Sequence, residues 1–198
     1  MTRSSFPHLI RTPLLALAAL TLATGAAAQT SASGPSVRFV VEGVLEAGGD
    51  EVATVTFQDG DTQTVRSGQG GTLAVGGHLR LNQASPFGVR ATAGFKYVTT
   101  AADNAHITLT RIPLELVGTY ELPNGVNFAA GFVRHTAIKF SADGVGDDLE
   151  FEDANGGTAE LGWKWVALTY TVMRYTDVQG GEYTANNAGV SLRYFFGR

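Results

Sequence analysis

The chain has 198 residues, with 14 lysines and arginines against 18 aspartates and glutamates, and it contains no cysteine. An acidic chain without a basic patch argues against nucleic acid as a partner. The lack of cysteine excludes disulfides, thiol catalysis, cysteine-bound metals and a lipid-modified N-terminal cysteine. The length suits a single domain.

The first 28 residues have the pattern of a signal peptide, with a short buried helix as the alternative reading. Arg3 and Arg11 give a positive start, and an apolar run then ends in three alanines before Gln29. Removing those two arginines leaves 12 basic residues against 18 acidic ones, a formal charge of −6. We therefore predict a signal peptide at 1–28, a flexible lead-in at 29–36 and one domain at 37–198.

Beyond the leader, apolar and polar residues alternate with a period of two almost throughout, which predicts β-strands. No run of about 18 apolar residues remains, so a transmembrane helix is not expected. Strands of a membrane barrel need only about 9–11 residues each, and they alternate. In chain order we predict eight strands, over 37–45, 72–82, 87–99, 107–120, 126–138, 158–165, 167–175 and 187–196.

The connections between the predicted strands alternate in length. The longer connections are 46–71, 101–106, 141–157 and 176–186, and the tight ones are 83–86, 122–125 and the turn at Val166. Of the 18 acidic residues, 14 fall in the longer connections. Outer-membrane barrels have long outside loops and short periplasmic turns. The asymmetry therefore favours a barrel with long acidic extracellular loops.

The two faces of each predicted strand also differ in polarity. In the stretch 87–97, Phe87 and Phe95 point to one side while Arg90 and Lys96 point to the other. A soluble sandwich would explain such alternation, but it would not predict the loop asymmetry. We predict an all-β, eight-stranded antiparallel up-and-down transmembrane β-barrel. Ten strands is the alternative, if a hairpin around Asp59 pairs into the wall.

The charged faces would then meet inside the barrel. An eight-stranded barrel is just wide enough for its side chains to fill the interior. We therefore predict a packed network of ion pairs, and a narrow, gated pore with a cationic bias is the alternative. The predicted polar network of the lumen consists of Arg38, Glu42, His78, Arg80, Arg90, Lys96, Glu115, Glu160, Lys164 and Arg193.

A few positions break this pattern. The simplest register turns Arg134 and Arg174 outward near the long-loop rim. They would meet lipid phosphates there, unless a local bulge turns them inward. The apolar parity also changes between Leu109 and Ile112, which predicts a bulge near Arg111.

Three stretches carry a resemblance to a known family: "RIPLELVGTYELPNGVNFAAGFVRH", "FEDANGGTAELGW" and "AGVSLRYFF". From about Val37 onward the chain resembles small outer-membrane β-barrel proteins of Gram-negative bacteria, the OmpA/OmpX-like eight-stranded group. The resemblance implies location in the bacterial outer membrane, contact with its lipid including lipopolysaccharide, and insertion by the outer-membrane assembly machinery. Tyr194 and Phe196 would form the assembly signal. Two departures from that signal are Ser191, where glycine is common, and the residues that follow Phe196.

Some barrels of this size modify lipids, and a deacylase of that kind would need a histidine with a serine and a carboxylate in hydrogen-bond reach. His135 has no serine two residues further on, and His78 and His106 have no evident catalytic partner in the sequence. We therefore predict no catalytic residue, no cofactor and no metal. The acidic run 143–153 has carboxylates suited to Ca²⁺ or Mg²⁺, but it lacks the EF-hand spacing, so a solvated loop is favoured.

These observations predict a non-enzymatic outer-membrane barrel with a structural, surface-interaction or narrow-pore role and an unknown extracellular partner. One alternative is a lipid-modifying barrel enzyme. The other is a soluble periplasmic carrier of an apolar ligand, which requires Phe95, Leu114 and Leu116 to face inward.

Overall fold

The computed structural model describes residues 34–56, 62–82, 84–102, 105–143 and 148–197. The predicted signal peptide and residues 29–33 of the predicted lead-in lie outside them. Within the described residues, no helix is both long and apolar enough to cross a membrane.

The described chain is built from β-strands, as the alternating pattern predicts. The long strands are β1 (Ser36–Ala47), β4 (Gly70–Arg80), β5 (Phe87–Ala102), β6 (Ala105–Glu121), β7 (Val126–Asp143), β9 (Ala154–Trp163), β10 (Val166–Thr176) and β12 (Asn187–Phe196). The short strands are β2 (Glu51–Thr56), β3 (Thr62–Arg66), β8 (Leu149–Glu150) and β11 (Glu182–Thr184).

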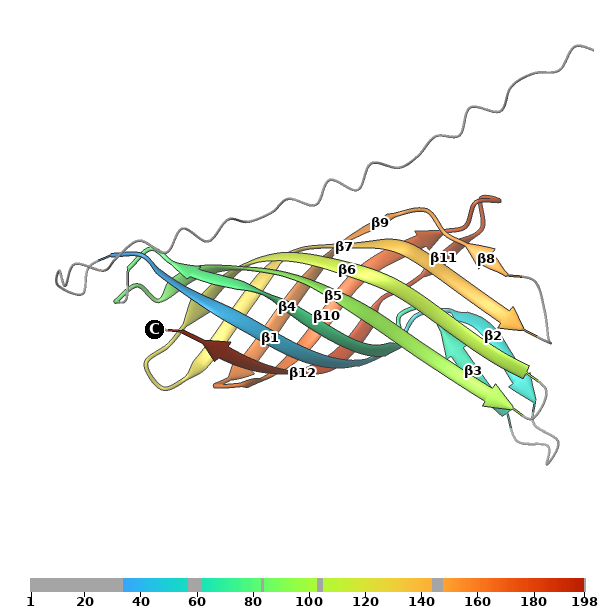
Figure 1. Ribbon diagram of the computed structural model, residues 1–198, viewed down its shortest axis with the longest axis horizontal. Helices are drawn as coiled ribbons and strands as arrows, with labels where there is room; N and C mark the ends of the chain where they lie inside the picture. Colours follow the sequence, from blue (N-terminus) through green and yellow to red (C-terminus); the bar gives the residue numbers. More distant parts are fainter. Residues whose placement is uncertain (1–33, 57–61, 83, 103–104, 144–147, 198) are drawn as a thin grey trace, which may run out of the picture. The chain divides into compact units, whose positions relative to one another are not determined.

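The long strands pair antiparallel in a ring-like sheet (Figure 1). Going around the ring, the order is β1, β4, β5, β6, β7, β9, β10 and β12, and β12 pairs back with β1. Neighbours in the ring are thus consecutive long strands of the chain. Closure satisfies the backbone groups that an open sheet would leave at its edges. The predicted all-β antiparallel architecture is confirmed.

The two ends of the ring differ. The tight turns, the start of β1 and the end of β12 lie at one end, and β2, β3, β8 and β11 lie at the other (Figure 1). We call these the short-turn end and the long-loop end. The connection 101–106 is shorter than predicted, because β5 and β6 pair as far as Ala102 and Ala105.

The first long connection contains the predicted hairpin. Strand β2 pairs with β3 in a two-stranded sheet of its own, in register from Ala53 opposite Val65 to Thr56 opposite Thr62, and the register shifts between Ala53 and the pair Glu51–Arg66. The turn around Asp59 lies outside the described residues. In the part of the chain that is described, this hairpin does not pair into the ring, so the pairing gives no support to a ten-stranded wall.

Side chains alternate between the outside and the inside of the ring. Phe95, Leu114 and Leu116 lie on the outside and are 54%, 42% and 53% exposed. The interpretation as a soluble carrier requires these three side chains inside, and that requirement is not met. Arg90 and Lys96, on the opposite face of β5, are almost completely buried.

The predicted irregularity is present, but it lies in the neighbouring strand. The register of β6 against β7 shifts between Thr110 and Ile112. The extra residue belongs to β7, where Ala137 has a φ of 50°. Strand β6 keeps its alternation, because Leu109 points inward together with Arg111. The predicted bulge in β6 near Arg111 is therefore wrong: the apolar parity changes because the interior becomes apolar.

An apolar cluster fills the interior toward the long-loop end. It includes Ile107, Leu109, Ile138 and Phe140 from the ring, and Val65 from the β2–β3 hairpin packs against them. The hairpin therefore covers part of the interior with its own apolar side chain.

Candidate functional site

The candidate site is the polar interior of the ring, and its centre is a layer of ion pairs. The Arg90 Nη2 atom donates to Glu160 Oε1 at 2.7 Å and to Glu115 Oε1 at 2.8 Å. The Arg193 Nε atom donates to Glu42 Oε1 at 2.7 Å, and its Nη2 atom lies 2.6 Å from Glu160 Oε1. Three carboxylates thus share two guanidiniums, and all five residues belong to the set that the sequence assigned to the lumen.

The strands bring these groups together from distant parts of the sequence. Glu42 and Arg193 are register partners on β1 and β12. Arg90 and Glu160 are 70 residues apart on β5 and β9, and they meet across the interior. The side chains of Arg90 and Glu160 are each only 2% exposed. Pairing is what makes such burial tolerable, since an isolated buried charge is very costly.

A second polar layer lies nearer the short-turn end. The Arg38 Nη2 atom donates to His78 Nδ1 at 3.2 Å, and His78 Nε2 lies 2.9 Å from the Thr119 hydroxyl. The guanidinium of Arg38 also lies over the Phe195 ring, 4.5 Å from its centroid. Arg80 forms an ion pair with Glu121. Arg38, His78 and Arg80 therefore lie inside the ring at the predicted faces, although their partners Thr119, Glu121 and Phe195 were not predicted.

Lys164 does not lie inside the ring, where the sequence analysis placed it. It lies in the tight turn between β9 and β10, where it has a φ of 56° and is exposed. Its Nζ atom lies 4.4 Å from the Trp163 ring centroid. Strand β9 ends at Trp163, so the alternation that would have turned Lys164 inward stops one residue earlier.

A third polar layer lies toward the long-loop end, and its basic side chains donate hydrogen bonds to the backbone of a loop. The Lys96 Nζ atom lies 2.8 Å from Glu46 Oε2 and donates to the carbonyl of Gly68 at 2.9 Å. Arg111, which is completely buried, donates to the carbonyl of Gln69. The segment Ser67–Gln69 between β3 and β4 thus enters the interior, and we call it the inserted segment.

The sequence did not predict the inserted segment. Ser67 and Gly68 are buried, and the Ser67 hydroxyl donates to the carbonyl of Thr184 at 2.7 Å. The stretch "SGQGG" looks like an ordinary polar turn. The sequence carried only a weak signal for it: Arg111 is a second basic residue, besides Lys96, on an inward face near the long-loop end.

His135 and Tyr175 form a buried pair beside this layer. The His135 Nδ1 atom lies 2.6 Å from the Tyr175 hydroxyl. Tyr175 is only 1% exposed, because the parity of β10 turns it inward, and its ring centroid lies 5.9 Å from that of Phe151. His135 is only 4% exposed, and it lines one of the interior cavities.

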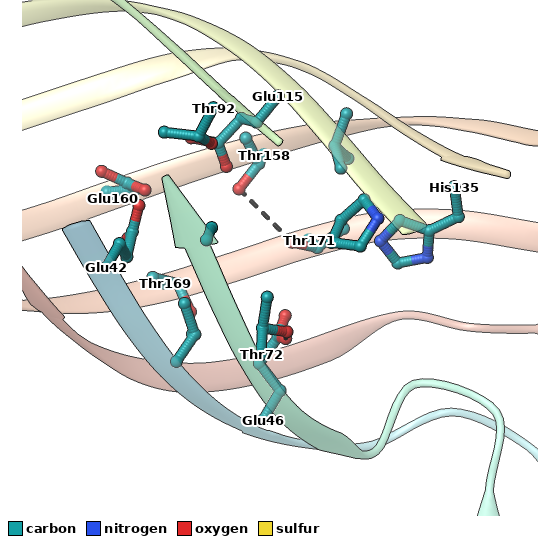
Figure 2. Close-up of a pocket in the computed structure, with 14 residues that line it drawn as sticks. Glu42, Glu46, Thr72, Thr92, Glu115, His135, Thr158, Glu160, Thr169 and Thr171 are labelled. Atoms are coloured by element: carbon teal, nitrogen blue, oxygen red, sulfur yellow. Dashed lines mark hydrogen bonds between the residues drawn. The ribbon is translucent and has the colours of Figure 1, made fainter. Parts of the chain in front are cut away.

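Two small cavities remain between these layers. One of about 50 Å³ lies among threonines and the carboxylates of Glu42, Glu46, Glu115 and Glu160 (Figure 2). In it, the Thr171 hydroxyl lies 3.3 Å from that of Thr158. Another, of about 100 Å³, lies near Arg38, His78 and Phe195. Cavities of this size have room for a few water molecules.

The outside of the long-loop end carries paired charges. Arg134 donates to Asp153 at 2.9 Å and Arg174 donates to Glu182 at 2.9 Å, and all four side chains are exposed. Lys139 lies 3.4 Å from Glu150. Of the two predicted alternatives for Arg134 and Arg174, the outward one is therefore the one observed.

The acidic run 143–153 is described only in part. The Asp148 Oδ1 atom accepts from the Ser141 hydroxyl at 2.9 Å and from the amide of Ala142 at 3.0 Å. Among the described residues, no group of three or more histidines and carboxylates is placed to hold a metal ion.

The residues predicted to form the assembly signal lie on the outside of β12. Tyr194 and Phe196 are exposed, and their ring centroids are 4.6 Å apart with the rings nearly perpendicular. The Phe196 ring also packs against Phe39 on β1, with centroids 5.9 Å apart. Trp163 and Trp165 are exposed at the same short-turn end.

No protein-family model and no curated protein matches the sequence. Among solved structures, the chain is similar to Neisserial surface protein A (NspA), with 12% identity over 81% of this chain and 99% of that chain, and a TM-score of 0.42. It is also similar to Ail, the attachment invasion locus protein of Yersinia pestis, with 9% identity over 82% of this chain and 99% of that chain, and a TM-score of 0.39. Both likenesses are distant.

Proposed function

We propose that this protein is an eight-stranded transmembrane β-barrel of the bacterial outer membrane. Its wall crosses the bilayer, its interior is closed, and its long-loop end faces the outside of the cell. In this role the protein is a structural or surface-interaction component, and catalysis is not its task.

The observation that carries the proposal is the contrast between the two faces of the ring. Apolar side chains cover the outside on every long strand, whereas the charged residues of the central layer are buried inside. In water, such an outside would be an apolar surface far larger than a soluble monomer carries. In a bilayer it meets hydrocarbon, and a closed ring leaves no backbone group of its wall unsatisfied.

The proposal includes three kinds of partner. Outer-membrane lipid, including lipopolysaccharide, would contact the apolar outside, with Trp163 and Trp165 in an aromatic belt near one interface. The outer-membrane assembly machinery would bind the last strand through Tyr194 and Phe196. The extracellular partner would be recognised by the acidic loops at the other end.

Two observations bear on the alternatives. The two interior cavities support a narrow pore as the second candidate, but the central ion pairs and the inserted segment lie across that path. A lipid-modifying enzyme would need a reactive group open to lipid, whereas His135 and His78 are enclosed within the interior.

The test compares arginine at two depths of the same outer surface. Val75 and Thr110 both point outward, but Val75 lies midway along β4 whereas Thr110 lies nearer the long-loop end. We expect Val75→Arg to lower the free energy of unfolding in lipid vesicles by about 2–4 kcal/mol and Thr110→Arg by about 0–1 kcal/mol. Denaturant unfolding of the vesicle-inserted protein measures both.

Membrane fractionation of cells that make the wild-type chain is the companion measurement. Recovery with the outer membrane supports the proposal. Recovery as a soluble periplasmic protein would refute it, as would equal tolerance of arginine at the two depths.

A further inference from the structure

Three polar side chains stand in a row on the outside of neighbouring strands. Arg134 on β7 is the register partner of Asn155 on β9. Strand β10 continues the row, because Met173 is the partner of Gly156 and Arg174 is the next residue. All three side chains are exposed. Neighbouring strands are about 4.8 Å apart, so the two arginines flank Asn155 with their Cα atoms about 10 Å from each other.

This row lies where the outer surface changes character. On its short-turn side the outward residues are Phe132 and Val172, which are 77% and 52% exposed. On its long-loop side, Asp153 and Glu182 are exposed and acidic. The arginines therefore mark the boundary between the apolar band and the polar rim, which in a bilayer is the depth of the lipid head groups.

A hollow opens beside the row. It has a volume of about 480 Å³ and is lined mainly by Leu114, Leu116, Phe132, Arg134 and Asn155. Its walls are thus apolar on one side, and an arginine and an amide stand at its edge. Such a site suits a ligand with an apolar chain and an anionic head.

The carboxylates of Asp153 and Glu182 leave N–H donors of both arginines available for a further ligand. Arg134 and Arg174 each use one nitrogen atom toward a carboxylate, and both pairs are exposed. Exposed ion pairs are weak. An arginine has five N–H donors in a planar fork, and that fork matches the oxygen atoms of a phosphate.

We propose that Arg134, Asn155 and Arg174 bind the phosphate group of an acylated lipid in the leaflet at the long-loop end, with one acyl chain in the adjacent hollow. The two arginines donate to the phosphate oxygens from either side, and the Asn155 amide can donate between them. This inference deepens the proposed function and rests on it, because only a barrel in a bilayer presents the row to lipid.

The experiment uses the full mature chain, folded in neutral detergent micelles. Native mass spectrometry measures binding of phosphatidic acid with two twelve-carbon chains, and phosphatidylcholine with the same chains serves as the comparison. We expect a preference for phosphatidic acid, and Arg134→Gln and Arg174→Gln should each weaken its binding about tenfold. Asp153→Asn should strengthen it, because a competing carboxylate is removed.

Lys139→Gln is the matched control, since it also removes one exposed, outward positive charge from β7. Lys139 is five residues beyond Arg134, about 16 Å along the strand, so its loss should change binding less than twofold. A loss equal to that of Arg134→Gln would overturn the site in favour of general charge attraction.

Two further measurements test whether the ligand is a lipid and whether the protein inserts into a membrane. Displacement of the lipid by an equal concentration of inorganic phosphate would overturn the lipid in favour of a free phosphate ion, and retention of the lipid supports it. A lack of preference for phosphatidic acid in a protein that does insert into vesicles refutes this inference alone. Failure of the wild-type chain to insert refutes the proposed function instead.

Discussion

At the scale of single residues, Glu160 holds the central layer together. Its Oε1 atom lies within 2.7 Å of nitrogen atoms from both Arg90 and Arg193. The parity of β9 predicted that Glu160 would face inward. Its partners could not be read from the sequence, because they depend on which strands face each other across the ring and on how the strands are staggered.

We expect Glu160→Gln to lower the free energy of unfolding by about 3–5 kcal/mol, because two buried guanidiniums lose their shared carboxylate. Glu121→Gln is the control, since Glu121 pairs with Arg80 at an exposed position. Its loss should cost no more than about 1 kcal/mol. Denaturant unfolding in the same detergent compares the two, and similar losses would contradict a dominant role for the central layer.

At the scale of elements, the inserted segment closes the interior at the long-loop end. It is held by side chains of β5 and β6, and its backbone lies against the segment that leads into β12. A Cβ atom on Gly68 would lie 2.9 Å from the carbonyl oxygens of Ala185 and Asn186. Only glycine permits so close an approach without displacement of the neighbouring backbone.

Gly68→Ala should therefore force the inserted segment outward, with an expected cost of about 1–3 kcal/mol. Arg66 precedes the segment, so trypsin cleavage after Arg66 should become about 5- to 150-fold faster, because cleavage follows the population of the open form. The control is Gly71→Ala, whose new Cβ atom would meet only Leu45 at 3.5 Å. Equal cleavage of the two variants would show that the segment is not held as described.

At the scale of the whole molecule, three layers obstruct the path through the ring. They are the central ion pairs, the Lys96 and Arg111 layer with its inserted segment, and the apolar cluster beneath the β2–β3 hairpin. An ion crossing this interior would have to lose water without a continuous polar replacement, which is costly.

We therefore expect the wild-type protein to give no steady current in a planar lipid bilayer. The same preparation must first be shown to insert into vesicles, so that silence is not mistaken for a failure to insert. Discrete current steps of uniform size would contradict a closed interior and would favour the second candidate, a narrow pore.

The sequence by itself determined the strands, their order and the face of most side chains. Alternation is a local property, and hydrophobic burial or lipid exposure acts on it one strand at a time. It therefore placed Arg90, Glu160 and Arg193 inside and Leu116 outside without knowledge of the pairing. Its errors at Lys164 and Arg111 have a common cause, because each depends on where a strand ends or where the interior becomes apolar.

Only the tertiary structure decided which charges meet, where the bulge lies and what closes the ring. These features depend on contacts between segments far apart in the chain, such as Ser67 with Thr184 and Arg90 with Glu160. Register and loop insertion arise from the sum of many cross-strand contacts. No local sequence pattern specifies those contacts, so the register and the position of the inserted segment are known only from the assembled structure.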